Sequence, residues 1–182
     1  MKRILLITGP PRTGKTTILL KTAEELKRRG YKLGGMTSQE IREMGIRRGF
    51  KIHDISSGRE GWLAHVHQSV GPTIGKYRVN LDDLYSVGVA AILSAIENAQ
   101  ILVIDEIGPM ELLSAEFQDA VQKAANSPKP MLCTIHYRTH HHLVRQLKCR
   151  KDADIIEVTQ ENRNRLPALI VHKTISLVES PH

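Results

Sequence analysis

One eight-residue loop constrains this chain more than any other feature. Residues 9–16 read Gly-Pro-Pro-Arg-Thr-Gly-Lys-Thr and match the pattern G-x-x-x-x-G-K-[ST]. The apolar run Arg3–Thr8 before the loop predicts a short strand, and the apolar spacing of residues 18–26 after it predicts a helix. A loop in this position turns backbone N–H groups inward, and the helix dipole adds positive potential. The sequence therefore predicts a phosphate-binding loop.

The residues of this loop have separate expected roles. We expect Lys15 to reach the β- and γ-phosphates of a nucleotide and to act in catalysis. The hydroxyl of Thr16 is expected to bind Mg²⁺, and Thr17 to contact the α-phosphate. The nucleotide-binding residues predicted in this segment are Gly9, Pro10, Pro11, Arg12, Thr13, Gly14, Lys15, Thr16 and Thr17.

A second acidic motif follows the aliphatic run Ile101–Ile104, which predicts a central strand buried on both faces. At its end, Asp105 is expected to hold Mg²⁺ through water. Glu106 is expected to polarise a water in line with the γ-phosphate, which favours hydrolysis over transfer to a second substrate. In isolation, both acids also fit a strand end or a solvated loop. The nucleotide contacts predicted in this segment are Val103, Ile104, Asp105, Glu106, Ile107 and Gly108.

The segment Asp105–Leu112, DEIGPMEL, resembles the DEIGxMEL signature of a P-loop nucleoside-triphosphatase family known first from thermophiles, with a cancer-related animal member. The resemblance extends to residues 40–50, 70–80 and 161–167. It implies a RecA-like P-loop fold and hydrolysis of ATP, GTP and other nucleoside triphosphates to the diphosphate. The loop departs from the family at Arg12, where glycine is usual. Because arginine does not easily adopt positive φ, we expect negative φ there or a reshaped loop tip.

The alternation of strands and helices predicts one α/β domain over residues 1–182, a three-layer fold with a mainly parallel sheet. Residues 38–80 are the irregular part and predict a β-hairpin insertion, with 69–80 as a loop. The strands expected are Lys32–Thr37, Phe50–Ile55, Trp62–Val66 as a hairpin partner of the previous one, Ile101–Ile104, Met131–Ile135 and Asp154–Val158. The later helices expected are 80–97, 114–125, 139–148 and a stretch after Thr159.

Charge is uneven along the 182 residues: residues 1–50 hold 12 Lys and Arg against 4 Asp and Glu. Such an excess suits nucleic acid, an anionic membrane surface or a phosphate-rich small molecule. Only 4% of the residues are aromatic, which disfavours stacking on single-stranded nucleic acid. No apolar run has membrane-spanning length, and no signal peptide is apparent. Two cysteines without metal-ligand spacing suit a reducing compartment, so we expect a cytoplasmic protein, with nucleic acid as a less favoured partner.

Several choices stay open at this point. A catalytic arginine is expected among Arg42, Arg47, Arg48, Arg138 and Arg163, and Arg163 is also expected to contact the nucleotide. His136 either orients the attacking water or is a polar strand-end residue, and residues 140–142 are expected at an exposed helix start. The alternatives to hydrolysis are a nucleotide or nucleoside kinase, with the acceptor held by residues 38–80, and a nucleic-acid-binding protein with a regulatory ATPase. The sequence does not reveal an oligomeric state.

Overall fold

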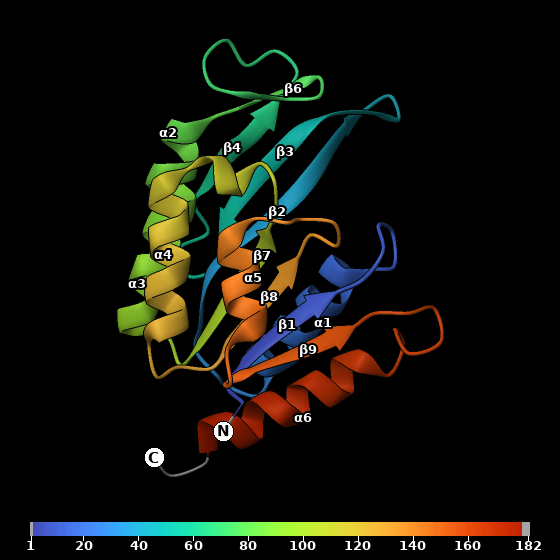
Figure 1. Cartoon of the computed structure of the whole chain (residues 1–182), viewed down its shortest axis with the longest axis vertical. Helices are drawn as coiled ribbons and strands as arrows, with labels where there is room; N and C mark the ends of the chain where they lie inside the picture. The colour runs from blue at the N-terminus through green and yellow to red at the C-terminus, as the bar shows by residue number, and fades with distance from the viewer. Residues whose placement is uncertain (1, 180–182) are drawn as a thin grey trace.

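The computed structural model describes residues 2–179, and within them nine strands form one sheet in the order β5-β6-β4-β3-β2-β7-β8-β1-β9 (Figure 1). From β2 to β9 in this order the strands pair in parallel, and from β2 to β5 they pair antiparallel. The parallel strands are β2 (Leu33–Glu43), β7 (Ile101–Ile107), β8 (Met131–Ile135), β1 (Ile4–Thr8) and β9 (Ala153–Glu157). The antiparallel strands are β3 (Ile46–Asp54), β4 (Glu60–His65), β5 (Thr73–Ile74) and β6 (Tyr77–Val79).

Helices cover both faces of the sheet, so the predicted three-layer α/β fold is confirmed (Figure 1). Side chains of α3, α4 and α5 join the core on one face, and those of α1 and α6 join the core on the other. The helices are α1 (Lys15–Arg28), α2 (Leu81–Asp83), α3 (Ala90–Asn98), α4 (Ala115–Asn126), α5 (His142–Cys149) and α6 (Leu166–Glu179). None of these helices has the length and apolarity that a membrane span would need.

The central strands show why the aliphatic runs are continuous. In β1, Ile4 and Leu6 belong to the core beneath α3–α5, and Leu5 and Ile7 belong to the core beneath α1 and α6. All four side chains are 0–1% exposed. Because successive residues of a strand point to opposite faces, a strand covered on both sides needs an apolar residue at every position. This packing fixes the carboxyl end of β1, where the phosphate loop begins.

The predicted β-hairpin insertion is confirmed, and it is longer than expected. The strand expected at 32–37 continues to Glu43, because β2 pairs with β7 over its first part and with β3 over the rest. Gly35 makes the parallel part possible: a Cβ at this residue would lie 2.0 Å from the carbonyl oxygen of Val103. The expectation that 69–80 is only a loop is wrong, since β5 and β6 pair there as a short hairpin.

Two helix boundaries also differ from the sequence-based expectation. The helix predicted over 80–97 begins after Asn80, whose side chain accepts from the Asp83 amide at 3.0 Å, but residues 84–89 widen into π-helical turns before α3. The helical stretch expected from Thr159 starts only at Leu166, because residues 160–165 form turns. There the Asn162 side chain accepts from the Thr159 amide at 2.8 Å and holds the chain out of the helix.

Candidate active site

The phosphate loop closes around the side chain of Lys15. Gly14, at φ 97°, precedes α1 as its N-cap, a conformation that favours glycine. The Lys15 ammonium donates to the carbonyl oxygens of Gly9 at 2.9 Å and Pro10 at 3.1 Å. Burial lowers the pKa of Lys15, while the charges of Glu106 and Asp105 oppose that shift. A cation therefore lies inside the loop, close enough to two acidic residues of β7 for their charges to act on it.

Arg12 adopts positive φ, so the expectation of negative φ at this residue is wrong. Its φ is 64°, in the left-handed region that the family's usual glycine enters freely. For a residue with a Cβ this conformation costs about 1–2 kcal/mol. The residue is exposed at the loop tip, where its side chain meets no steric barrier from the core. Arg12 thus has a backbone conformation that glycine would adopt without this cost.

Asp105 joins the phosphate loop to the sheet. The Thr16 hydroxyl donates to its Oδ1 at 3.1 Å, and the Thr134 hydroxyl of β8 donates to the same oxygen. Asp105 is 1% exposed, and its burial raises the pKa to about 6. The other oxygen, Oδ2, is buried without a hydrogen-bond partner among residues 2–179. An unpartnered carboxylate oxygen beside a threonine hydroxyl suits Mg²⁺, which prefers oxygen ligands, so these residues fit the ion predicted here.

Two further carboxyls lie close to this point. Glu106 is the next residue of β7, and burial raises its pKa while the Lys15 ammonium lowers it. Glu111 is only 3% exposed, and burial followed by the charge of Glu106 raises its pKa well above 4.5. Gly108 leaves room for the catalytic candidate, because a Cβ there would lie 2.7 Å from Oε1 of Glu106. The two carboxyls together therefore hold a proton more readily than two exposed ones would.

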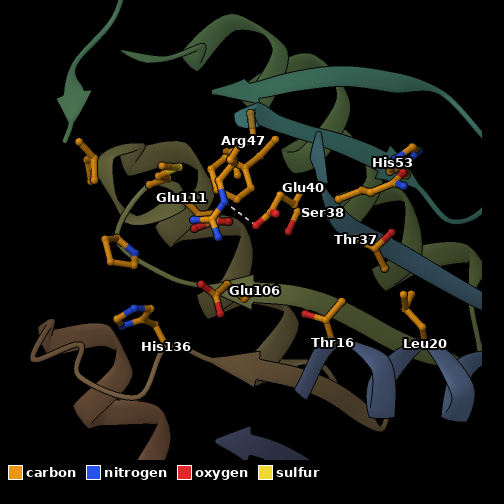
Figure 2. A pocket seen from close by; sticks show the side chains of 16 residues that line it. Thr16, Leu20, Thr37, Ser38, Glu40, Arg47, His53, Glu106, Glu111 and His136 are labelled. Atoms are coloured by element: carbon orange, nitrogen blue, oxygen red, sulfur yellow. Dashed lines mark ion pairs between the residues drawn. The ribbon is translucent and has the colours of Figure 1, made fainter. Parts of the chain in front are cut away.

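A cavity of about 930 Å³ opens beside these groups (Figure 2). Thr16 and Glu106 lie along one side of it, and Arg47, Glu40 and Ser38 of the β2–β3 hairpin face them from the other. The Arg47 guanidinium forms an ion pair with Glu40 and lies over the Phe50 ring, 5.7 Å from its centroid. The full lining is Thr16, Leu20, Thr37, Ser38, Gln39, Glu40, Arg47, Phe50, His53, Leu63, Ile74, Glu106, Pro109, Met110, Glu111 and His136.

Some predicted site residues gather here and others do not. Of the arginines in residues 2–179, Arg47 is the one that lines this cavity. Arg163 is exposed in the turns after β9, and Thr17 is exposed on the first turn of α1. The side chains of Val103, Ile104 and Ile107 are fully buried in the two cores, so they support the strand and present no surface to a nucleotide.

His136 lines the cavity at the end of β8. Its amide donates to the Ile107 carbonyl at 3.3 Å, and its Nδ1 is buried without a hydrogen-bond partner in the described part of the chain. Burial, followed by the charge of Lys15, lowers the pKa of this imidazole. A neutral imidazole that can accept or donate a proton thus faces the same space as Glu106. Of its neighbours in sequence, His141 caps α5 by accepting from the Leu143 amide at 3.2 Å.

Sequence reasoning missed two contributors to the site. Thr134 bonds Asp105 from the adjacent strand, and no motif marks it, because the contact depends on the β7–β8 register. The DEIGPMEL signature contains Glu111 but indicates no role for it. An acid six residues after Asp105 in an otherwise apolar stretch was the available signal, since buried acids concentrate at functional sites.

Comparison with known proteins points to one family. The model of a family described as NTPase matches residues 4–171. The nucleoside-triphosphatase THEP1 of Thermofilum pendens is 50% identical over 174 residues, covering 95% of this chain and 96% of that protein. The THEP1 of Methanosarcina acetivorans is 43% identical over 170 residues, covering 93% of this chain and 95% of the relative.

Two solved structures have the same fold. The crystal structure of THEP1 from the hyperthermophile Aquifex aeolicus superposes with a TM-score of 0.80 at 29% identity, covering 97% of this chain and 99% of the other. The solution structure of a human cancer-related nucleoside triphosphatase gives a TM-score of 0.81 at 35% identity, with 96% and 98% covered. Since the family model spans most of the sequence and the relatives match nearly end to end, the chain belongs to the NTPase family.

Proposed function

We propose that this member of the NTPase family hydrolyses nucleoside triphosphates to the diphosphate and phosphate with the help of Mg²⁺. The observation that carries the proposal is the meeting of the phosphate loop, the Thr16–Asp105 hydrogen bond and Glu106 at one side of a cavity. Loop residues 9–17 would hold the phosphates, and their amides and the Lys15 ammonium would stabilise the negative charge. Thr16 and Asp105 would hold the ion, which supplies charge neutralisation at the β- and γ-phosphate oxygens.

Glu106 is the proposed general base. Its carboxylate would accept a proton from a water in the cavity as that water's oxygen forms a bond to the γ-phosphorus. The bond between the γ-phosphorus and the β–γ bridging oxygen breaks, and the electron pair leaves with the diphosphate. Lys15 would stay close to the leaving oxygen, because its ammonium lies within the loop that holds the phosphates. Burial raises the pKa of Glu106, which makes it a stronger base than an exposed carboxylate.

Arg47 is the arginine we assign to the γ-phosphate. It lines the cavity together with Thr16 and Glu106, whereas Arg42, Arg48, Arg138 and Arg163 do not. Its ion pair with Glu40 and its place over Phe50 restrain the guanidinium, so less side-chain entropy is lost when it meets an anion. A guanidinium there would stabilise charge on the γ-phosphate oxygens during transfer.

The test of the proposed function is phosphate release by the wild type and by Glu106→Gln. Loss of the base is expected to lower kcat by about 10²- to 10⁴-fold while nucleotide binding persists, because the phosphate loop is unchanged. Glu24→Gln, on the exposed side of α1, is the matched control and should hydrolyse at the wild-type rate. Wild-type turnover by the Glu106→Gln variant would remove Glu106 from its role.

A further inference from the structure

We infer that Thr134 of β8 is a positioning residue for Mg²⁺: its hydroxyl holds Asp105 so that one carboxylate oxygen stays available to the ion. The inference rests on the proposed function, since that function places Mg²⁺ at Thr16 and Asp105. Its starting point is the hydrogen bond that the Thr134 hydroxyl donates to Oδ1 of Asp105, between the paired strands β8 and β7. Thr134 does not line the cavity, so it can influence a bound nucleotide only through a neighbour such as Asp105.

Thr134 is a polar residue at a position where a buried strand usually has an apolar one. The side chain is 0% exposed, as are those of its strand neighbours Cys133 and Ile135. Burying a hydroxyl group lowers stability unless the group forms a hydrogen bond. A valine here would have the same branched shape and would bury no polar atom. The bond to Asp105 therefore accounts for the hydroxyl at this position.

The two strands direct Thr134 and Asp105 to the same face of the sheet. Leu132 and Val103, which lie two residues before them, belong to the core beneath α1 and α6. Because side chains two residues apart on a strand share a face, Thr134 and Asp105 also face α1. The hydroxyl of Thr16, in the first turn of α1, lies 3.1 Å from Oδ1 of Asp105. Segments from β7, β8 and α1 thus meet at one carboxylate.

Both hydroxyls act on the same oxygen of that carboxylate. Thr16 and Thr134 donate to Oδ1 of Asp105, whereas Oδ2 is buried and has no hydrogen-bond partner among residues 2–179. The last side-chain torsion of an aspartate has broad energy wells, so a carboxylate without such bonds turns easily. Two donors on one oxygen restrict this rotation. The other oxygen is left as a ligand for a cation, and carboxylate oxygens are ligands that Mg²⁺ prefers.

Of the two donors, Thr134 is the one whose task is to orient Asp105. The Thr16 hydroxyl is itself assigned to the ion, and Thr16 is exposed at the start of α1. Thr134 is fully buried, so solvent water does not compete for its hydrogen bond. Replacing a residue that hydrogen-bonds a metal ligand in this way typically weakens metal binding by about 10- to 100-fold. We expect Thr134 to contribute within that range.

The test measures how tightly Mn²⁺ binds to the protein with ADP present, from the electron paramagnetic resonance signal of free Mn²⁺. Mn²⁺ serves as the probe because it suits the same oxygen ligands as Mg²⁺. Thr134→Val removes the hydroxyl and keeps the branched shape, so the Kd of Mn²⁺ should rise about 10- to 100-fold. The affinity for ADP without metal should stay at the wild-type value, because the loop amides that hold the phosphates are unchanged.

Two further variants separate positioning from packing. Thr134→Ser keeps the hydroxyl and should bind Mn²⁺ nearly as tightly as the wild type, although the missing methyl group lowers its stability. Thr174→Val removes another fully buried threonine hydroxyl, which donates to the Ile170 carbonyl within α6 at 2.7 Å. This control should leave the Kd of Mn²⁺ unchanged. Circular dichroism checks that each variant is folded, and Thr134→Ala replaces Thr134→Val, with the same expected rise, if the valine variant is not.

Three results would count against the inference. Equal Kd values for Mn²⁺ in the wild type and in Thr134→Val would overturn it and leave the proposed function intact. The same loss of affinity in Thr134→Ser and Thr134→Val would also overturn it, because packing and not the hydroxyl would then determine the affinity. If the wild type binds no Mn²⁺ beside ADP, the inference fails together with the proposed magnesium site.

Discussion

Arg47 is the arginine whose loss we expect to slow hydrolysis most. It lines the cavity with Glu106, and a catalytic arginine contributes on the order of 10³-fold or more to phosphoryl transfer. Arg47→Ala should therefore lower kcat by that order with a small change in KM, because the guanidinium would act on charge that develops in the transition state. Arg47→Lys should recover only part of the rate, since an ammonium lacks the planar fork. Steady-state assays of phosphate release give kcat and KM for the wild type and for both variants.

Arg48 provides the control for this prediction. It is the next residue of β3, it pairs with Glu43 at 3.3 Å, and it does not line the cavity. Arg48→Ala should keep kcat within about twofold of the wild type, because a surface ion pair contributes little to a site it does not touch. Equal losses in the two alanine variants would show that the hairpin, and not the Arg47 guanidinium, is what the reaction requires.

Glu111 should make the folded protein less stable as the pH rises. Its pKa lies well above 4.5 in the folded state because of burial and the nearby charge of Glu106. The folded chain then binds this proton more tightly than the unfolded chain, so the free energy of unfolding decreases as the pH rises from about 4.5. In Glu111→Gln the free energy of unfolding should decrease less over this pH range. The variant should therefore become more stable relative to the wild type as the pH rises. Urea unfolding at several pH values measures the free energy of unfolding of both proteins. If it changes with pH in the same way in both, the prediction is contradicted.

At the scale of elements, Gly35 decides whether β2 can join the parallel half of the sheet. Its φ is 117°, and an added Cβ would lie 2.0 Å from the Val103 carbonyl oxygen. Gly35→Ala should therefore lower the free energy of unfolding by more than about 3 kcal/mol, through strain and a backbone clash. Gly58, in the turn before β4, has φ 74° and no atom within 4 Å of its Cβ position, so Gly58→Ala should cost only about 1 kcal/mol. Thermal unfolding measures the stability of both variants, and an equal loss of stability in Gly35→Ala and Gly58→Ala would contradict the prediction.

The elements that the sequence predicted are those specified by local pattern. The phosphate loop is specified by its spacing between a strand and a helix, and β7 by four consecutive aliphatic residues before Asp105. The hairpin insertion was also expected, since residues 38–80 lacked helical periodicity. In each case a short stretch of chain contains the whole signal, because burial on both faces or a tight turn limits the residue types allowed.

What the sequence did not predict depends on contacts between distant segments. The partnership of Thr134 with Asp105 needs the register of β7 and β8, which no local pattern specifies. The choice of Arg47 over Arg48 depends on which side of β3 each residue occupies, and the register shift between Ile41 and Arg42 alters that alternation. Positive φ at Arg12 was also missed, because the course of the loop outweighed the preference of one residue. In each case the feature is determined by contacts between segments that are distant in the sequence.

At the scale of the whole molecule, the two halves of the sheet have different tasks. The parallel half, covered on both faces, places the phosphate loop after β1 and Asp105 near the carboxyl end of β7, with β8 between the two strands, at the edge where ligands of open α/β sheets bind. The antiparallel half extends the same sheet and supplies Ser38, Glu40 and Arg47 to the far wall of the cavity (Figure 2). The reaction site thus lies where the sheet changes from one kind of pairing to the other.

Part of the basic charge of residues 2–50 is already paired with acidic side chains. In residues 1–50, Arg28 and Arg29 both pair with Glu25 at the end of α1, and Arg3 pairs with Asp152 at 2.8 Å. Of the remaining basic residues of this segment, Lys2 precedes β1 and Lys32 precedes β2, and the others divide among the phosphate loop, the rest of α1 and the hairpin. Because nucleic-acid affinity increases with the number of phosphates contacted at once, this distribution favours weak and sequence-independent binding.

A gel-shift series with duplex DNA at increasing salt tests this reading of the charge. We expect weak binding that declines steeply between about 50 and 200 mM salt, because release of counterions drives it. Neither DNA nor RNA should raise the rate of phosphate release, since the site is complete without them. The variant Lys21→Gln, at an exposed position of α1, should weaken the shift for every sequence alike and leave hydrolysis unchanged, as this residue lies outside the cavity. Salt-resistant binding, or hydrolysis stimulated by nucleic acid, would instead favour a nucleic-acid-binding protein with a regulatory ATPase.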